Sequence, residues 1–353
     1  MNTSTLARKL AIGTLALASL ILAGCSSVAP SANATSSSTS KVTYSGAEKA
    51  LPTSYGKPTL KDGYSFTIGW LAPTLANPFV EAAYNAGKKE TAKLGGKFIG
   101  LDAGLDVSKQ LDECNQLLAE NVTAIAVYPV DPGSLAPCLA KASAAGIPVI
   151  GEDTPPEAGK PLLANYISSV QQGIDYPRFL TAQYAATLNQ DSQFATIGLV
   201  IPVPLLQYSI ARATYWANKF GFKPTVNVLA QAPTPQAAAD AANTIITRYP
   251  KVKVIFAYDD GSAAAAAHAL AAAGHADVRV YGITGQQSTI NTIKAGDGVT
   301  ATILLNPAAI GVQEVWGLYD TLTKQHLPLP AQVRPNATLV TKANAAQVTG
   351  IAG

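Results

Sequence analysis

The fold is decided by residues 65–79, which read SFTIGWLAPTLANPF. The first half of this stretch, up to Leu71, is almost continuously apolar, which is typical of a strand that is covered on both faces. Asn77 and Pro78 then predict the start of a helix, because an asparagine side chain caps free backbone N–H groups and proline suits the first helical position. We expect this helix to continue to Leu94, where two glycines end it.

The same strand–helix unit recurs through the rest of the chain. We expect strands at residues 97–102, 123–128, 147–150, 194–201, 225–230, 252–258, 278–283 and 299–304, and helices at residues 107–120, 134–145, 206–220, 236–249, 262–273 and 288–295. Strands that alternate with helices form parallel sheets with right-handed crossovers. One doubly wound sheet rarely holds so many strands, so the sequence predicts an α/β fold of two doubly wound parallel-sheet lobes.

The N-terminal segment has the features of an export signal. Arg8 and Lys9 precede an apolar run that is shorter than the ~20 residues of a membrane span. The run ends in Leu22-Ala23-Gly24-Cys25, which resembles the bacterial lipobox. We therefore interpret residues 1–25 as a lipoprotein signal peptide with a lipidated Cys25. An ordinary cleavable signal with a coincidental cysteine is the alternative.

Residues 26–63 are expected to form a flexible tether. The part up to Ser45 is rich in Ser, Thr and Ala and poor in large apolar side chains, so it cannot bury a core. A lipid anchor followed by a tether predicts an extracytoplasmic protein that is held at the cell membrane.

Composition and motifs argue against several classes of protein. The chain is 48% hydrophobic and 13% charged, which indicates a globular protein. The formal net charge is only +3 and includes Arg8 and Lys9 of the expected signal, so no basic face remains to bind nucleic acid. The sequence has no dinucleotide-binding glycine motif after a strand, no P-loop and no nucleophile elbow, and its three histidines lack metal or triad spacing. We expect no enzyme, no catalytic residue, no metal site and no cofactor.

Two cysteines remain after Cys25, and outside the cytoplasm such a pair is a disulfide candidate. Cys114 and Cys138 lie in the second and third expected helices. If the strand order is 2-1-3-4, right-handed crossovers place these helices on one face of the sheet as neighbours. We therefore expect a Cys114–Cys138 disulfide, with two buried free cysteines as the alternative.

Several segments resemble, in order, those of a known family. They are residues 68–79, 128–131 (YPVD), 145–150 (AGIPVI), 255–260 (IFAYDD), 293–296 (IKAG), 301–303 (ATI) and 339–341 (LVT). Over residues 64–344 the chain resembles the ribose- and galactose-type periplasmic binding proteins, the type I sugar receptors of ABC importers. The resemblance implies two lobes joined by a three-segment hinge, an N-lobe at residues 64–168 plus 306–334 and a C-lobe at residues 169–305 plus 335–353. We expect a monomer that traps a small molecule between its lobes and passes it to an ABC transporter permease.

The resemblance also implies ligand contacts at the ends of several strands. Asn77 matches a hydroxyl-binding Asn, with a plain helix cap as the alternative, and Phe79 matches an aromatic that stacks on a sugar ring, with core packing as the alternative. Asp153 matches a carboxylate that accepts two hydroxyl bonds, and Arg212 matches an arginine that forks onto the ligand. A solvated loop residue and an exposed helix residue are their alternative roles. Further candidates are Tyr128, Tyr258, Asp259, Thr284 and Leu305.

The chain departs from the family pattern at several of these positions. Thr284 stands where an Asp is common, Leu305 where a Gln is common, and Asp259 where an Asn is common. The cleft is therefore expected to be less densely polar than a pentose or hexose site. We expect a sugar or sugar alcohol first and an amphipathic non-sugar solute second, and a receptor for a membrane signalling protein is the alternative function. A bound cation also stays open, because four acidic residues end strands: Glu152, Asp153, Asp259 and Asp260.

Overall fold

The computed structural model describes residues 51–152, 168–170, 184, 193–198, 229–231 and 234–351. The expected signal peptide with Cys25, most of the expected tether, and the candidate residues Asp153 and Arg212 lie outside these ranges.

The described strands form two six-stranded sheets. The first has the order β11-β5-β4-β3-β1-β2, from β11 (Gln332–Val333), β5 (Ser168–Val170), β4 (Val149–Glu152), β3 (Ala124–Val127), β1 (Thr67–Ala72) and β2 (Lys97–Asp102). The second has the order β12-β10-β9-β8-β6-β7, from β12 (Thr338–Thr341), β10 (Ala301–Leu304), β9 (Arg279–Tyr281), β8 (Val252–Ala257), β6 (Gln193–Gly198) and β7 (Leu229–Gln231). The described pairs are parallel except that of β10 with β12. The prediction of an α/β fold with two doubly wound parallel sheets is confirmed.

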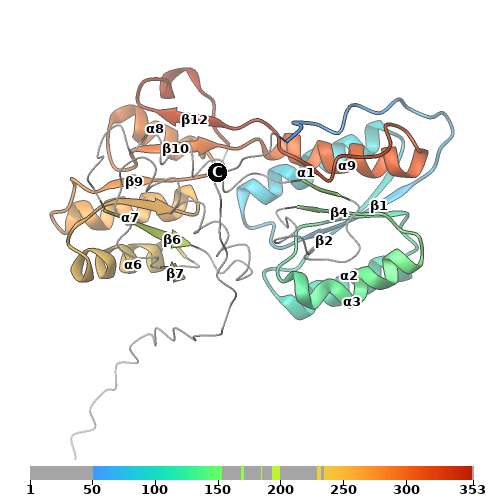
Figure 1. Ribbon diagram of the computed structural model, residues 1–353, viewed down its shortest axis with the longest axis horizontal. Helices are drawn as coiled ribbons and strands as arrows, with labels where there is room; N and C mark the ends of the chain where they lie inside the picture. The colour runs from blue at the N-terminus through green and yellow to red at the C-terminus, as the bar shows by residue number, and fades with distance from the viewer. Residues whose placement is uncertain are drawn as a thin grey trace, which may run out of the picture. The chain divides into compact units, whose positions relative to one another are not determined.

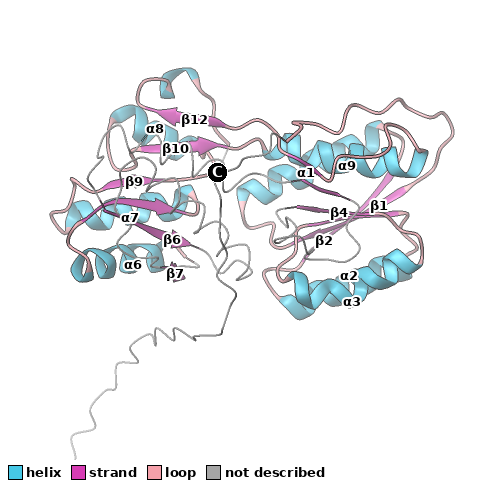
Figure 2. Cartoon of the chain, viewed as in Figure 1, coloured by secondary structure: helices cyan, strands magenta, loops and turns pink. Residues whose placement is uncertain are grey.

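Helices cover both faces of the first sheet (Figure 1). α1 (Pro78–Lys93) and α9 (Pro307–Thr323) pack together on one face, and α2 (Val107–Ala119) and α3 (Pro132–Ala144) pack together on the other. The second sheet carries α6 (Pro235–Arg248), α7 (Asp260–Ala272), α8 (Gln287–Ala295) and the short 3₁₀ helix η1 (Ala345–Gln347) (Figure 2). No described helix is long and apolar enough to cross a membrane.

The close packing of α1 on α9 depends on a glycine. A Cβ on Gly311 would lie 2.0 Å from the backbone oxygen of Ala83 on α1, so a larger residue would push the helices apart. This contact holds α9, which follows β10 of the second sheet, against the first sheet.

The chain passes between the two sheets after β5, after β10 and after β11. These three passages are the three connections expected between the lobes. The lobe boundary expected between Ser168 and Ser169 falls within β5, because Ser169 and Val170 pair in the first sheet with Gly151 and Glu152.

Residues 51–61 are packed against α9, so the expectation that the flexible tether extends to residue 63 is wrong for this part. Tyr55 is only 5% exposed and joins the core. The side-chain oxygen Oε1 of Gln313 accepts hydrogen bonds from Tyr55 N at 2.7 Å and from Ser54 Oγ at 2.9 Å. Lys61 N donates to Tyr319 Oη at 2.8 Å. The expectation rested on the polar composition up to Ser45. In residues 51–61, by contrast, Tyr55 is buried and backbone N–H groups donate to side chains of α9.

A disulfide joins α2 to α3, as the strand order β2-β1-β3-β4 led us to expect. Cys114 Sγ and Cys138 Sγ are 2.04 Å apart, and both residues are fully buried. The bond ties two neighbouring helices on one face of the first sheet.

Candidate ligand-binding site

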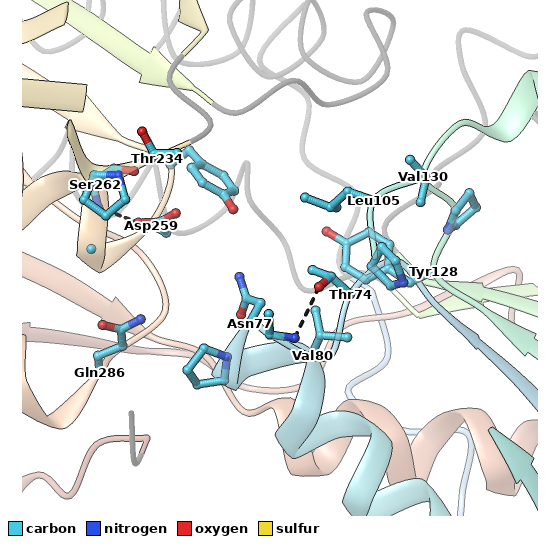
Figure 3. A pocket seen from close by; sticks show the side chains of 17 residues that line it. Thr74, Asn77, Val80, Leu105, Tyr128, Val130, Thr234, Asp259, Ser262 and Gln286 are labelled. Carbon is cyan, nitrogen blue, oxygen red and sulfur yellow. Dashed lines mark hydrogen bonds between the residues drawn. The ribbon is translucent and has the colours of Figure 1, made fainter. Parts of the chain in front are cut away.

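A cavity of about 380 Å³ lies where strands of both sheets end and the following helices begin (Figure 3). This is the edge at which open parallel sheets bind ligands, and the volume suits a small molecule. One side, which we call the first-sheet wall, comes from the segments after β1, β2 and β3 and is lined by Pro73, Thr74, Ala76, Asn77, Pro78, Val80, Leu105, Tyr128, Pro129 and Val130. The other side, the second-sheet wall, comes from the segments after β7, β8 and β9 and is lined by Thr234, Pro235, Tyr258, Asp259, Gly261, Ser262 and Gln286.

Asn77 is placed on the first-sheet wall by its role as the N-cap of α1. Its Oδ1 accepts a hydrogen bond from Phe79 N at 2.9 Å, so the alternative role of a helix cap is present. The cap uses only the carbonyl oxygen of the side chain, which leaves the Nδ2 group to donate to a ligand. A ligand-binding role and a capping role are therefore compatible.

Tyr128 is held on the same wall through its backbone. Its N–H donates to Leu71 O at 3.0 Å, which continues the ladder between β1 and β3. Its carbonyl oxygen accepts a bond from Gln110 Nε2 at 2.9 Å. The half-buried ring adds an aromatic face and a phenol group to the cavity.

The second-sheet wall is built in a similar way, from the N-caps of two helices. Asp259 Oδ1 accepts from Ser262 N at 2.6 Å at the start of α7, and Thr234 Oγ1 accepts from Ala237 N at 3.1 Å at the start of α6. Burial, together with the neighbouring carboxylate of Asp259, raises the pKa of the Tyr258 phenol well above its usual value. Tyr258 thus stays a neutral hydroxyl group at any physiological pH.

Behind this wall lies Asp260, which is fully buried. Its Oδ2 accepts from Gln286 N at 2.6 Å and its Oδ1 accepts from Thr302 Oγ1 at 2.5 Å. Burial raises the pKa of Asp260 to about 7, although these hydrogen bonds act in the opposite direction. Asp260 does not line the cavity, and the described residues contain no cluster of His, Cys, Asp and Glu that could hold a metal ion.

The structure brings four of the predicted site residues together and leaves three apart. Asn77, Tyr128, Tyr258 and Asp259 line the cavity. Phe79, Thr284 and Leu305 do not line it, and they are only 5%, 8% and 3% exposed.

These three residues differ in what surrounds them. Phe79 and Leu305 belong to one hydrophobic core cluster, and core packing is the alternative that we gave for Phe79. Thr284 has a φ of +125°, which is strained for a β-branched residue, and its buried Oγ1 has no hydrogen-bond partner among the described residues.

Sequence reasoning did not single out Leu105, Thr234 or Gln286, which also line the cavity. Each lies between the end of an expected strand and the next helix, so strand-end position was a usable signal for all three.

The family model of the periplasmic binding protein domain matches residues 68–326. The chain belongs to this family. This periplasmic binding protein is similar to the ribose import binding protein of Bacillus subtilis (strain 168). The two are 27% identical over 253 residues, which cover 70% of this chain and 78% of the relative. The D-apiose import binding protein of Paraburkholderia graminis is 25% identical over 285 residues, 80% of this chain and 89% of the relative.

A solved structure supports the fold of this periplasmic binding protein. The ABC transporter solute binding protein of Mycobacterium smegmatis, solved with bound glycerol, superposes with a TM-score of 0.71 at 24% sequence identity and covers 81% of this chain and 98% of its own. The type I periplasmic binding protein fold that the sequence predicts is confirmed.

Proposed function

We propose that this protein is the solute-binding component of an ABC importer and that it captures a sugar or sugar alcohol in the cavity. The observation that carries the proposal is the lining: amides and hydroxyls from both walls surround a cavity that contains one carboxylate, Asp259, among the described residues. Such groups donate to and accept from hydroxyls, and the tyrosine rings and prolines pack against C–H faces. The names of the matched relatives, which include ribose and D-apiose import binding proteins, support the same class of ligand.

The proposed mechanism is a population shift. A ligand that bonds to both walls at once favours the conformation in which the walls are close, and the permease recognises that conformation. Asp153 and Arg212 stay proposed ligand contacts, one from each expected lobe. We expect Asp153→Ala and Arg212→Ala each to weaken binding about tenfold or more, since each removes a charge-assisted hydrogen bond.

A thermal-shift screen tests the ligand class directly. The panel contains ribose, D-apiose, glycerol, pentitols and hexitols, with amino acids and small organic acids as the comparison set. A ligand at 100 times its Kd stabilises the native state by about 2.7 kcal/mol, so a cognate sugar or polyol should raise the Tm clearly. A rise in Tm with an organic acid or another non-sugar alone would favour the second candidate ligand, an amphipathic non-sugar solute. The apolar side chains of Val80 and Leu105 in the first-sheet wall would suit such a ligand.

We further propose that the mature protein is a monomer anchored outside the cytoplasm through a lipid on Cys25. The sequence before Cys25 supports this, because it has the order of a lipobox. Cys25→Ser should abolish labelling by a fatty acid and release the protein from membranes, and unchanged labelling would refute the anchor. A permease and ATPase gene pair beside this gene would support uptake, whereas a neighbouring histidine kinase gene would support the alternative of a sensory receptor.

A further inference from the structure

Gln110 has an unusual place behind the first-sheet wall. It lies on α2, is fully buried and does not line the cavity. Its side chain reaches the segment between β3 and α3 with both ends: Nε2 donates to Tyr128 O at 2.9 Å, and Oε1 accepts from Val130 N at 2.7 Å. Tyr128 and Val130 both line the cavity.

The two bonds replace partners that the sheet and helix cannot supply. Tyr128 and Val130 lie between the last residue of β3 and Asp131, the N-cap of α3. The Tyr128 carbonyl and the Val130 N–H therefore lie outside the regular hydrogen bonding of β3 and of α3. Both bonds are partly buried, and backbone groups that are shielded from water need a partner; a glutamine amide offers one donor and one acceptor. The amide thus fixes the course of the wall at two points.

The helix that carries Gln110 is itself fixed. Cys114 follows one turn later on the same face of α2 and is bonded to Cys138 on α3. α2 is therefore attached to α3 by the disulfide and to the segment that leads into α3 by Gln110. A shift of α2 along its axis would break the Gln110 hydrogen bonds, and the disulfide opposes such a shift.

We propose that Gln110 is a positioning residue of the ligand cavity, which sets the shape of the Tyr128–Val130 wall without contacting the ligand. The inference rests on the proposed function in so far as it takes this cavity to be the ligand site. The local role of Gln110 can nevertheless be measured without any ligand.

The test compares hydrogen exchange in the wild-type chain and in Gln110→Met, which keeps the length of the side chain and removes both bonds. The matched control is Gln116→Met on the exposed face of α2, where the side-chain amide donates to Glu120 Oε1. Loss of a hydrogen bond of about 1.4 kcal/mol should speed exchange of the Val130 N–H about tenfold. Exchange in residues 258–262 of the opposite wall should not change, and Gln116→Met should change neither region.

A second variant, Gln110→Glu, separates positioning from simple packing. The ionised side chain cannot donate to Tyr128 O, whereas the protonated one can donate there and still accept from Val130 N. Because both forms accept from Val130 N, Gln110→Glu should keep more of the Val130 protection than Gln110→Met does, whereas a role in packing alone predicts no such difference between the two variants. Unchanged protection of Val130 in Gln110→Met, or the same loss in both walls, would overturn the proposal.

Ribose is the probe for the binding part of the experiment, with affinity measured by calorimetry. Gln110→Met should bind ribose about tenfold more weakly than Gln116→Met. Absence of ribose binding to the wild type would count against the proposed function for ribose, and the exchange comparison would still decide the role of Gln110.

Discussion

Behind the first-sheet wall of the cavity lies a neutral amide, that of Gln110, whereas behind the second-sheet wall lies a carboxylate, that of Asp260. Both side chains are fully buried, and both accept a bond from the backbone N–H of a cavity residue, Val130 in one case and Gln286 in the other. The first wall also depends on the disulfide between α2 and α3. We therefore expect the first-sheet wall to be sensitive to redox state, through the disulfide, and the second-sheet wall to be sensitive to pH, through Asp260.

The largest expected effect concerns the pH dependence of Asp260. Its folded-state pKa of about 7 lies above the usual value, so folding takes up a proton between pH of about 4 and 7. The stability that this proton contributes is fully present below pH 4 and is lost as the pH rises through 7. Against Asp260→Asn, which keeps an acceptor for Gln286 N, wild type should lose about 1.4 kcal/mol of unfolding free energy per pH unit in that interval.

Urea unfolding at several pH values measures this difference. The matched control is the same substitution at Asp277, an exposed carboxylate that pairs with Lys253. The hydrogen bond from Lys253 lowers the pKa of Asp277, so its stabilising contribution is present above the usual pKa and is lost only as the pH falls further into acid. If the unfolding free energies of wild type and Asp260→Asn changed in parallel between pH 4 and 8, Asp260 would not have a raised pKa in the folded protein.

The second effect concerns the disulfide behind the first-sheet wall. Cys114 and Cys138 are separated by 24 residues, and a bond that closes such a loop contributes about 3 kcal/mol in the chain-entropy model. The double variant Cys114→Ala/Cys138→Ala should lose about that much unfolding free energy in urea. Hydrogen exchange should become faster in residues 128–131 and stay unchanged in residues 258–262. Equally faster exchange in both walls would show that the disulfide does not stabilise the first-sheet wall in particular.

The smallest effect concerns the N-cap of α1. Asn77→Ser keeps a side chain that caps helices well, so stability should change by only a few tenths of a kcal/mol. The shorter side chain loses the amide that we expect to donate to the ligand, which should weaken binding of the cognate sugar or polyol by about threefold to tenfold. Calorimetry on this variant would show unchanged affinity if Asn77 were a cap alone.

Local sequence signals predicted much of the fold. The strand at 97–102 matches β2 at both ends, and Asn77 and Pro78 mark the start of α1 correctly, because capping chemistry is local. The sequence pattern did not indicate a helix over α9, whose glycines weaken the helical signal. The structure gives the reason for them: a Cβ on Gly317 would lie 2.5 Å from Ile150 Cδ1, and one on Gly311 would meet α1.

The candidate site was predictable in part for the same reason. Strand ends can be located from the sequence, and four of the candidates at these ends line the cavity. The direction of a side chain one or two residues later depends on the helix face, so Phe79 packs in the core while Asn77 reaches the cavity. Gln110 carries no local signal, because its role arises only when α2 lies beside the segment after β3.

Binding calorimetry on a variant that alters both walls tests the central claim most directly. Asn77→Ser/Asp259→Ser keeps a capping residue on α1 and on α7 but removes an amide from one wall and a carboxylate from the other. Titrated with the sugar or polyol that gives the largest thermal shift, wild type should bind one molecule, and the variant should bind at least about thirtyfold more weakly with only a small change of Tm in the absence of ligand. Equal affinity in the two proteins would contradict the account and would mean that the ligand binds outside this cavity.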